Sequence, residues 1–172
     1  MKKIPVRKLA YAAVVGAAYA ALTMLLYPIS YGPVQFRVSE VLCILPFFDP
    51  IYAVGLFVGC AIANLISSAG ILDIVFGSLA TLAAGLCTAR IGRGGHSLGR
   101  CIAGCAMPVV WNGVVVGAVL AAAGTVTRDT FWAAYILYGA EVAGGEALVL
   151  YGLGLPLLYF LPNLKIFSRL VH

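Results

Sequence analysis

Residues 35–49, QFRVSEVLCILPFFD, place two charged side chains, Arg37 and Glu40, beside a run of apolar residues. Charge is scarce in this chain, because Asp, Glu, Lys and Arg together make up only 10% of it. An ionised side chain within a bilayer is costly unless it pairs, faces protein or lines a wet cavity. We therefore expect Arg37 and Glu40 to line a polar pocket. Positions three apart on a helix also suit a structural ion pair between the two, and this alternative stays open.

The composition around this stretch is that of a protein built to sit in lipid. Hydrophobic residues make up 63% of the 172, and the mean hydropathy is +1.05. An ordinary soluble domain carries about a quarter of its residues as charged ones, so that class is excluded. A membrane-spanning helix needs about 20 apolar residues, so the length allows about six spans joined by short loops. We predict an all-α integral membrane protein with one domain over residues 1–172 and no soluble domain, so that any ATP hydrolysis occurs on partner chains.

Several functional classes are disfavoured by the same inventory. The net charge of +5 comes from basic residues at helix ends and in one loop, which membrane topology explains without nucleic acid. Cys101 and Cys105 are one helical turn apart but lack the further Cys or His of a closed zinc site. The sequence contains no HExxH, and its two histidines, His96 and His172, fall in a predicted loop and at the C-terminal residue, so an intramembrane enzyme is disfavoured. We expect no metal and no cofactor.

The apolar runs and their breakers predict six helices. They are expected at about residues 7–26, 36–48, 51–67, 71–89, 98–123 and 131–161. The basic N-terminus resembles a signal peptide, but its apolar run is longer than a typical one, so we expect a retained first span. Pro108 is expected to interrupt the fifth helix, and Gly152, Gly154 and Pro156 to loosen the end of the sixth.

Basic residues set the expected orientation. They cluster before the first expected helix, between the fourth and fifth, and after the sixth. Six helices bring all three clusters to one face, and the positive-inside rule makes that face cytoplasmic. The N- and C-termini are therefore predicted to be cytoplasmic.

Small residues recur on the first helix in two neighbouring rows. One row is Ala13, Ala17 and Ala21, and the other is Ala12, Gly16 and Ala20. Such rows allow close helix approach in membranes. The doubled row favours a surface that docks on a separate subunit, with packing inside the same bundle as the alternative.

A second group of polar residues falls inside or beside the expected helices. Asn64 and Asp73 lie near the predicted outer surface, while Asn112 and Glu146 lie about 16 and 22 Å down their helices at about 1.5 Å per residue. Asp73 could instead cap its helix or complement the helix dipole. Polar side chains can also simply join helices.

Aromatic and acidic residues accompany this group. Trp111 precedes Asn112, and Tyr138 and Glu141 share the last helix with Glu146. Positions 141 and 146 point about 140° apart on a regular helix, so only one of these two carboxylates can face the pocket centre. Amides, carboxylates and aromatic rings suit a planar, nitrogen-rich ligand, and a small aromatic cation would fit them well.

Five blocks of this sequence resemble the QueT family, the substrate-binding S components of energy-coupling factor (ECF) transporters assigned to queuosine precursors. The blocks are QFRVSEVLCILP (35–46), GLFVGCAIANLIS (55–67), LDIVFGSLATLAA (72–84), PVVWNGVVVG (108–117) and GEALVLYGLGLP (145–156). The resemblance implies a six-helix S-component fold in the bacterial plasma membrane and capture of a 7-deazaguanine such as preQ1, queuine or queuosine from outside. Matching positions make Arg37, Glu40, Asn64, Asp73, Asn112 and Glu146 the candidate pocket residues.

The resemblance also implies partners. The row Ala13, Ala17 and Ala21 would dock on a transmembrane coupling subunit that is driven by two ATPase subunits. A carboxylate pair would favour the aminomethyl cation of preQ1 over neutral preQ0. Another vitamin-like heterocycle, such as thiamin, biotin or a purine, and a structural subunit without a ligand remain alternatives.

Overall fold

The computed structural model describes residues 5–31, 36–67, 69–124, 127 and 129–163, and every regular element in this part of the chain is helical. The long α-helices are α1 (Val6–Leu25), α3 (Ile51–Ala63), α4 (Ser78–Gly92), α5 (Leu98–Ala123) and α6 (Phe131–Val149). Shorter elements complete the fold: α2 (Tyr27–Ser30), η1 (Val38–Phe47), η2 (Asn64–Ile66), η3 (Asp73–Gly77), η4 (Leu150–Gly154), α7 (Leu155–Phe160) and η5 (Leu161–Asn163).

The expected helix ranges agree with these elements at most boundaries. The range 98–123 is α5 itself, and α1 differs from its expected range by one residue at each end. The last helix does loosen where glycines were expected to loosen it, because η4 is a π-helical segment between α6 and α7. The expected interruption at Pro108 is wrong, since α5 continues through this buried proline. A proline removes only one backbone donor, which a well-packed membrane helix can tolerate.

Two short elements depart from the simple six-helix pattern. The segment expected as a helix at 36–48 is a 3-10 helix, η1, that holds Pro46. The turn after α1 contains a further short helix, α2, with Pro28 in its first turn, where a missing N–H costs nothing.

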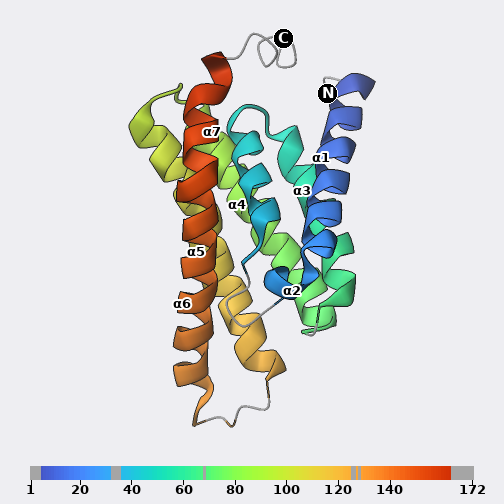
Figure 1. Ribbon diagram of the computed structural model, residues 1–172, viewed down its shortest axis with the longest axis vertical. Coiled ribbons are helices and arrows are strands. Elements are labelled where there is room, and N and C mark those ends of the chain that lie inside the picture. The colour runs from blue at the N-terminus through green and yellow to red at the C-terminus, as the bar shows by residue number, and fades with distance from the viewer. Residues whose placement is uncertain (1–4, 32–35, 68, 125–126, 128, 164–172) are drawn as a thin grey trace.

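Among the residues that the structure describes, four helical stretches are long and apolar enough to cross a membrane: Val6–Leu25, Asp73–Gly92, Leu98–Ala123 and Phe131–Phe160. Two shorter apolar helices, Val38–Phe47 and Ile51–Ile66, occupy the other two expected positions. In Figure 1 the start of α1 and the end of α7 lie at the same end of the bundle. Six crossings and cytoplasmic termini remain predictions that fit this arrangement.

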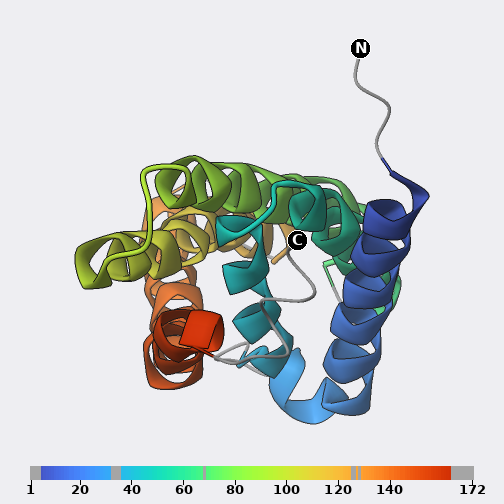
Figure 2. The same ribbon diagram turned by 90° about the horizontal axis from the view of Figure 1, so that it is seen from above.

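The stretch with Arg37 and Glu40 lies at the centre of the bundle. Figure 2 shows η1 enclosed by α1 on one side, α3 and α4 on a second, and α6 with α7 on a third. Contacts join η1 to each of these helices and to α5. A short, apolar helix with one carboxylate therefore forms the middle of the fold.

Glycines bring α1 against α3. A Cβ on Gly16 would collide with the backbone carbonyl of Gly55, and one on Gly59 would collide with the carbonyl of Gly16. Only glycine, which has no Cβ, permits the two helix backbones to approach so closely.

The two small-residue rows of α1 consequently have different environments. Ala12, Gly16 and Ala20 are buried, and the contacts of Gly16 place that row against α3. Ala13, Ala17 and Ala21 are exposed in this chain. Packing inside the bundle thus explains one row, and docking on another subunit remains a prediction for the other.

Candidate functional site

The described chain buries four charged side chains, and all four are residues that the sequence analysis selected. They are Arg37, Glu40, Asp73 and Glu146, each at most 6% exposed. The two selected amides, Asn64 and Asn112, are also at most 4% exposed.

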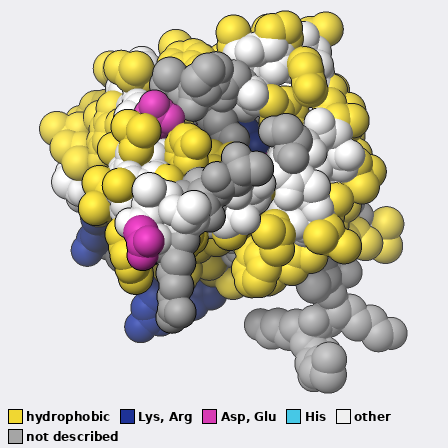
Figure 3. All heavy atoms as spheres, turned by 90° about the horizontal axis from the view of Figure 1, so that it is seen from below, with side chains coloured by type: hydrophobic (Ala, Val, Ile, Leu, Met, Phe, Trp, Pro, Cys, Tyr) yellow, Lys and Arg dark blue, Asp and Glu magenta, His cyan; other side chains and the backbone are white. Residues whose placement is uncertain are grey.

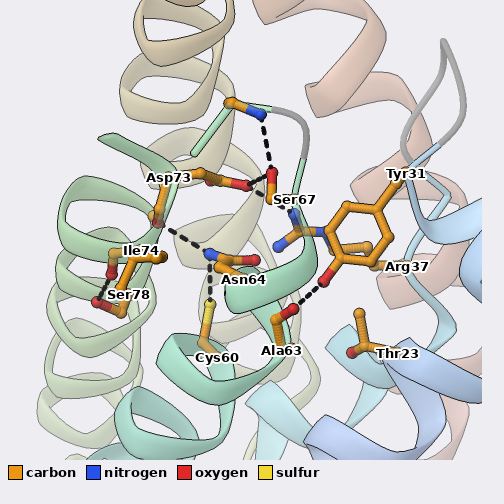
Figure 4. A network of polar contacts seen from close by, with 12 residues as sticks. Thr23, Tyr31, Arg37, Cys60, Ala63, Asn64, Ser67, Asp73, Ile74 and Ser78 are labelled. Atoms are coloured by element: carbon orange, nitrogen blue, oxygen red, sulfur yellow. Dashed lines mark hydrogen bonds and ion pairs between the residues drawn. The ribbon is translucent and has the colours of Figure 1, made fainter. Parts of the chain in front are cut away.

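Arg37 forms an ion pair with Asp73, which is 36 residues further along the chain (Figure 4). The Arg37 Nη2 to Asp73 Oδ2 distance is 3.3 Å, and Ser67 donates its hydroxyl to the same carboxylate oxygen at 2.6 Å. The alternative of a local Arg37–Glu40 pair is wrong within the described residues. Arg37 precedes η1 with an extended backbone, φ −92° and ψ 97°, so the two side chains do not follow the spacing of one helix.

Asp73 does not act as a helix cap here. It is the first residue of η3, and no side-chain hydrogen bond caps that segment. A Cβ on Gly77 would lie 2.5 Å from Asp73 Oδ1 and 2.9 Å from the amide nitrogen of Asn64. Gly77 therefore leaves the space in which these two polar side chains meet.

Asn64 donates to the backbone carbonyl of Asp73, while its own side-chain oxygen receives no hydrogen bond from the described residues. Its amide donates to the Asp73 carbonyl at 2.9 Å and lies 3.5 Å from the Cys60 sulfur. Within the described residues, Asn64 Oδ1 is buried without a hydrogen-bond partner.

Tyr31, which the sequence analysis did not select, covers the Arg37 guanidinium. The Arg37 Cζ atom lies 5.0 Å from the centroid of the Tyr31 ring, a cation–π geometry. The Tyr31 hydroxyl donates to the Ala63 carbonyl at 2.6 Å. Burial raises the pKa of Tyr31 to about 12, so the phenol stays neutral and remains a donor.

Glu146 and Asn112 form the second buried group. Asn112 on α5 donates its amide to Glu146 Oε1 on α6 at 2.6 Å. The other two acceptors of this pair, Asn112 Oδ1 and Glu146 Oε2, have no partner among the described residues. Close packing of α5 on α6, where Gly117 faces Gly139, brings these helices together.

Glu40 is the centre of a third group, and both of its oxygens accept hydrogen bonds. Tyr19 on α1 donates its hydroxyl to Oε1, and the Cys43 thiol lies 2.9 Å from Oε2. Tyr19 and Cys43 are further functional candidates that sequence reasoning missed. An aromatic residue within the small-residue stretch of α1 was the only local signal for Tyr19.

The three groups belong to one polar interior. The carboxylate of Glu146 lies within electrostatic range of both Glu40 and Arg37, and Arg37 is paired with Asp73. Figure 3 shows the molecule from below, with a Lys or Arg side chain visible near the centre of this face. Hydrogen bonds, one ion pair and electrostatic interactions thus connect the six buried residues.

Three other selected residues lie apart from these groups. Trp111 is 37% exposed, and Tyr138 and Glu141 are partly exposed. Glu141 lines a groove along α6 with Gly144 and Leu148. Of the two carboxylates on α6, Glu146 therefore lies in the polar interior, and roles in ligand binding for the other three residues stay predictions.

The interior has more free acceptors than free donors. Among the described residues, the buried side-chain atoms without a hydrogen-bond partner are Ser30 Oγ, Arg37 Nε, Asn64 Oδ1, Asp73 Oδ1, Asn112 Oδ1 and Glu146 Oε2. Buried polar atoms in native proteins are normally paired, so such a group indicates a bound molecule or water. Four of these atoms are amide or carboxyl oxygens, which accept hydrogen bonds, and one is a donor, the Arg37 Nε–H; this set suits a ligand rich in N–H groups.

Comparison with known proteins gives two findings. The model of a family described as "QueT transporter" matches residues 9–163. A curated protein, "Queuosine precursor transporter QueT" of Lactococcus lactis subsp. cremoris (strain MG1363), is 43% identical over 84 residues, which are 48% of this chain and 49% of that protein. The matched region thus covers about half of the length of this curated relative. No solved structure matches the chain.

Proposed function

The chain belongs to the QueT transporter family, and from this premise we propose that it is the substrate-binding S component of an ECF transporter. It captures a queuosine precursor or a related 7-deazaguanine, such as preQ1, queuine or queuosine, from outside the cell. The curated relative carries the name of a queuosine precursor transporter. The ligand class is inferred for this chain from that name and from the chemistry of the buried site.

The observation that carries the proposal is the set of unpartnered buried acceptors. A 7-deazaguanine presents N–H groups on its pyrimidine ring, its exocyclic amine and its pyrrole ring. Asn64, Asp73, Asn112 and Glu146 each offer an acceptor without a partner among the described residues. Arg37 offers the donor that a ring carbonyl requires.

The charges of the buried side chains favour a cationic ligand over a neutral one. Three buried carboxylates, those of Glu40, Asp73 and Glu146, accompany one buried cation, Arg37. Because Arg37 is paired with Asp73, the other two carboxylates have no cationic partner among the described residues. An aminomethyl cation, as in preQ1, would balance this charge, whereas the neutral nitrile of preQ0 would not.

Transport requires partners that this chain would meet in the membrane. We place the chain in the bacterial plasma membrane as a multi-pass protein with cytoplasmic termini. The exposed row Ala13, Ala17 and Ala21 would dock on the transmembrane coupling subunit, and two ATPase subunits would supply the energy.

Ligand-dependent stabilisation of the purified chain tests the proposal. The melting temperature in detergent is measured with preQ1, preQ0, queuine, queuosine, guanine and thiamin, each added in turn. A ligand at about 1,000 times its dissociation constant adds about 4 kcal/mol to the free energy of unfolding. We expect preQ1 or another 7-deazaguanine to give a large shift and thiamin to give none.

The variant Glu146→Gln identifies the key carboxylate. It keeps the shape and the Asn112 contact but removes the charge, so the shift should shrink strongly. Glu141→Gln makes the same change at the partly exposed carboxyl group on the same helix, so loss of the shift in this variant instead would assign the ligand contact to Glu141. A folded chain that responds to thiamin or to another heterocycle alone would transfer the assignment to that ligand. A folded chain that responds to none of the six would refute the proposal.

A further inference from the structure

Tyr19 lies at the point where α1 meets the polar interior. Its side chain is fully buried, and its hydroxyl donates to Glu40 Oε1, 21 residues further along the chain. The other donor to Glu40 is the thiol of Cys43, which is a weak donor. Tyr19 is therefore the main hydrogen-bond support of the Glu40 carboxylate within the described residues.

Glu40 depends on hydrogen bonds from within the protein. It is 1% exposed, and the oxygens of a buried carboxyl group are costly to leave without donors. The nearby cation, Arg37, makes its ion pair with Asp73 instead. Glu146 is a second acidic side chain that interacts electrostatically with Glu40.

We infer that Tyr19 is a positioning residue that sets the ligand preference of this protein. Its hydroxyl holds the Glu40 carboxyl group in place, so that Glu40 and Glu146 together bind a cationic ligand in preference to a neutral one of the same shape. This inference rests on the proposed function. It assigns a role in recognition to α1, a helix that carries none of the six selected pocket residues.

The packing of Tyr19 makes a clean test possible. Its ring belongs to a buried cluster with Cys43, Leu56, Cys60 and Ala63. The close approach of α1 to α3 at Gly16 fixes the helix that carries the ring. Tyr19→Phe keeps this ring and removes only the hydroxyl, so it should fold with the same packing.

A neighbouring hydrogen bond provides a matched control. Thr23, one turn further along α1, shares a hydrogen bond of 2.6 Å with Ser39 of η1. Both side chains are fully buried, as Tyr19 is. Thr23→Val therefore removes a buried contact between the same two helices and leaves Glu40 with both of its donors.

The experiment measures the dissociation constants of the purified chain for cationic preQ1 and neutral preQ0 by isothermal titration or ligand competition. Tyr19→Phe should weaken preQ1 binding about tenfold or more relative to preQ0, the usual size of a lost hydrogen bond to a charged group. Thr23→Val should leave the ratio of the two constants unchanged. In a Glu40→Gln background, Tyr19→Phe should cause no further loss of preQ1 binding, because the carboxyl group that the hydroxyl positions is absent.

Each outcome has a separate meaning. Equal weakening of both ligands by Tyr19→Phe, or an unchanged preQ1 affinity, would overturn the inference and leave the proposed function standing. Full additivity of Tyr19→Phe and Glu40→Gln would also overturn it. A folded wild-type chain that binds neither preQ1 nor any other 7-deazaguanine would instead overturn the proposed function.

Discussion

Asp73→Asn is the substitution that most directly tests the buried ion pair. It keeps the size of the side chain and an acceptor for Ser67 but removes the charge opposite Arg37. Arg37 is 6% exposed and Asp73 is fully buried, so the cation would be left unpaired in a region that water reaches poorly. Breaking a buried pair in this way costs about 3–5 kcal/mol in the free energy of unfolding.

The structure places this substitution at the lower end of that range. Within the described residues the pair has a single contact, at 3.3 Å, and the Tyr31 ring would continue to stabilise the guanidinium. We therefore expect a loss of about 3 kcal/mol for Asp73→Asn. Arg37→Gln should cost a similar amount, because it leaves the Asp73 carboxylate with only its neutral donors.

The double variant measures the interaction energy between Arg37 and Asp73 separately from the contacts that each makes with other residues. Residues in one ion pair show coupling energies of about 0.5–3 kcal/mol, so Arg37→Gln with Asp73→Asn should be less destabilised than the sum of the two single variants. Unfolding of the chain in mixed detergent and SDS micelles, followed by circular dichroism, gives the three free energies. Losses below about 1 kcal/mol in both single variants, or strict additivity in the double variant, would refute the reasoning.

Three further predictions concern the packing of α1 on α3 and the exposed ion pair of Lys8 with Asp49. Gly16→Ala should lower the free energy of unfolding by about 1–3 kcal/mol in the same assay, because its Cβ would collide with the Gly55 carbonyl. Gly144→Ala has open space at its Cβ and should be neutral or stabilising by up to about 1 kcal/mol. Equal effects of the two substitutions would contradict the close contact of α1 with α3. Lys8→Ala removes an exposed ion pair of 2.5 Å with Asp49 and should cost less than about 1 kcal/mol, with an effect that fades in high salt. Asp49→Ala should cost more than Lys8→Ala, because Asp49 also accepts the first backbone N–H of α3 at 3.0 Å, and the reverse order in salt-dependent melting would count against this role.

The identity of the buried polar residues could be predicted from the sequence because the chain is so poor in charge. In a chain with 10% charged residues, an ionisable side chain within an apolar run has few explanations besides pairing or a polar cavity. Arg37, Glu40, Asp73 and Glu146 were selected on this basis, and they are the charged residues that the described structure buries. Most helix ranges followed from the same hydropathy contrast and from proline and glycine positions.

Pairing partners could not be predicted in this way. Helical spacing suggested Glu40 as the partner of Arg37, but the extended backbone at Arg37 turns its side chain toward Asp73. Tyr19 was missed because a tyrosine in an apolar helix is usually explained by packing in the core or at the membrane interface. Its hydroxyl gains a role only because Gly16, Gly55 and Gly59 let α1 approach the centre of the bundle.

The sequence by itself determined that this chain is a helical, membrane-type protein, which polar residues it encloses, and which family it resembles. Hydropathy and charge scarcity are local properties, so they can be summed along the chain without knowing its fold. Only the tertiary structure decided that Glu146 rather than Glu141 lies inside and that one row on α1 is covered and the other exposed. It also decided which buried acceptors have no donor among the described residues. These outcomes depend on helix rotation and on close backbone contacts between distant segments, which no local pattern specifies.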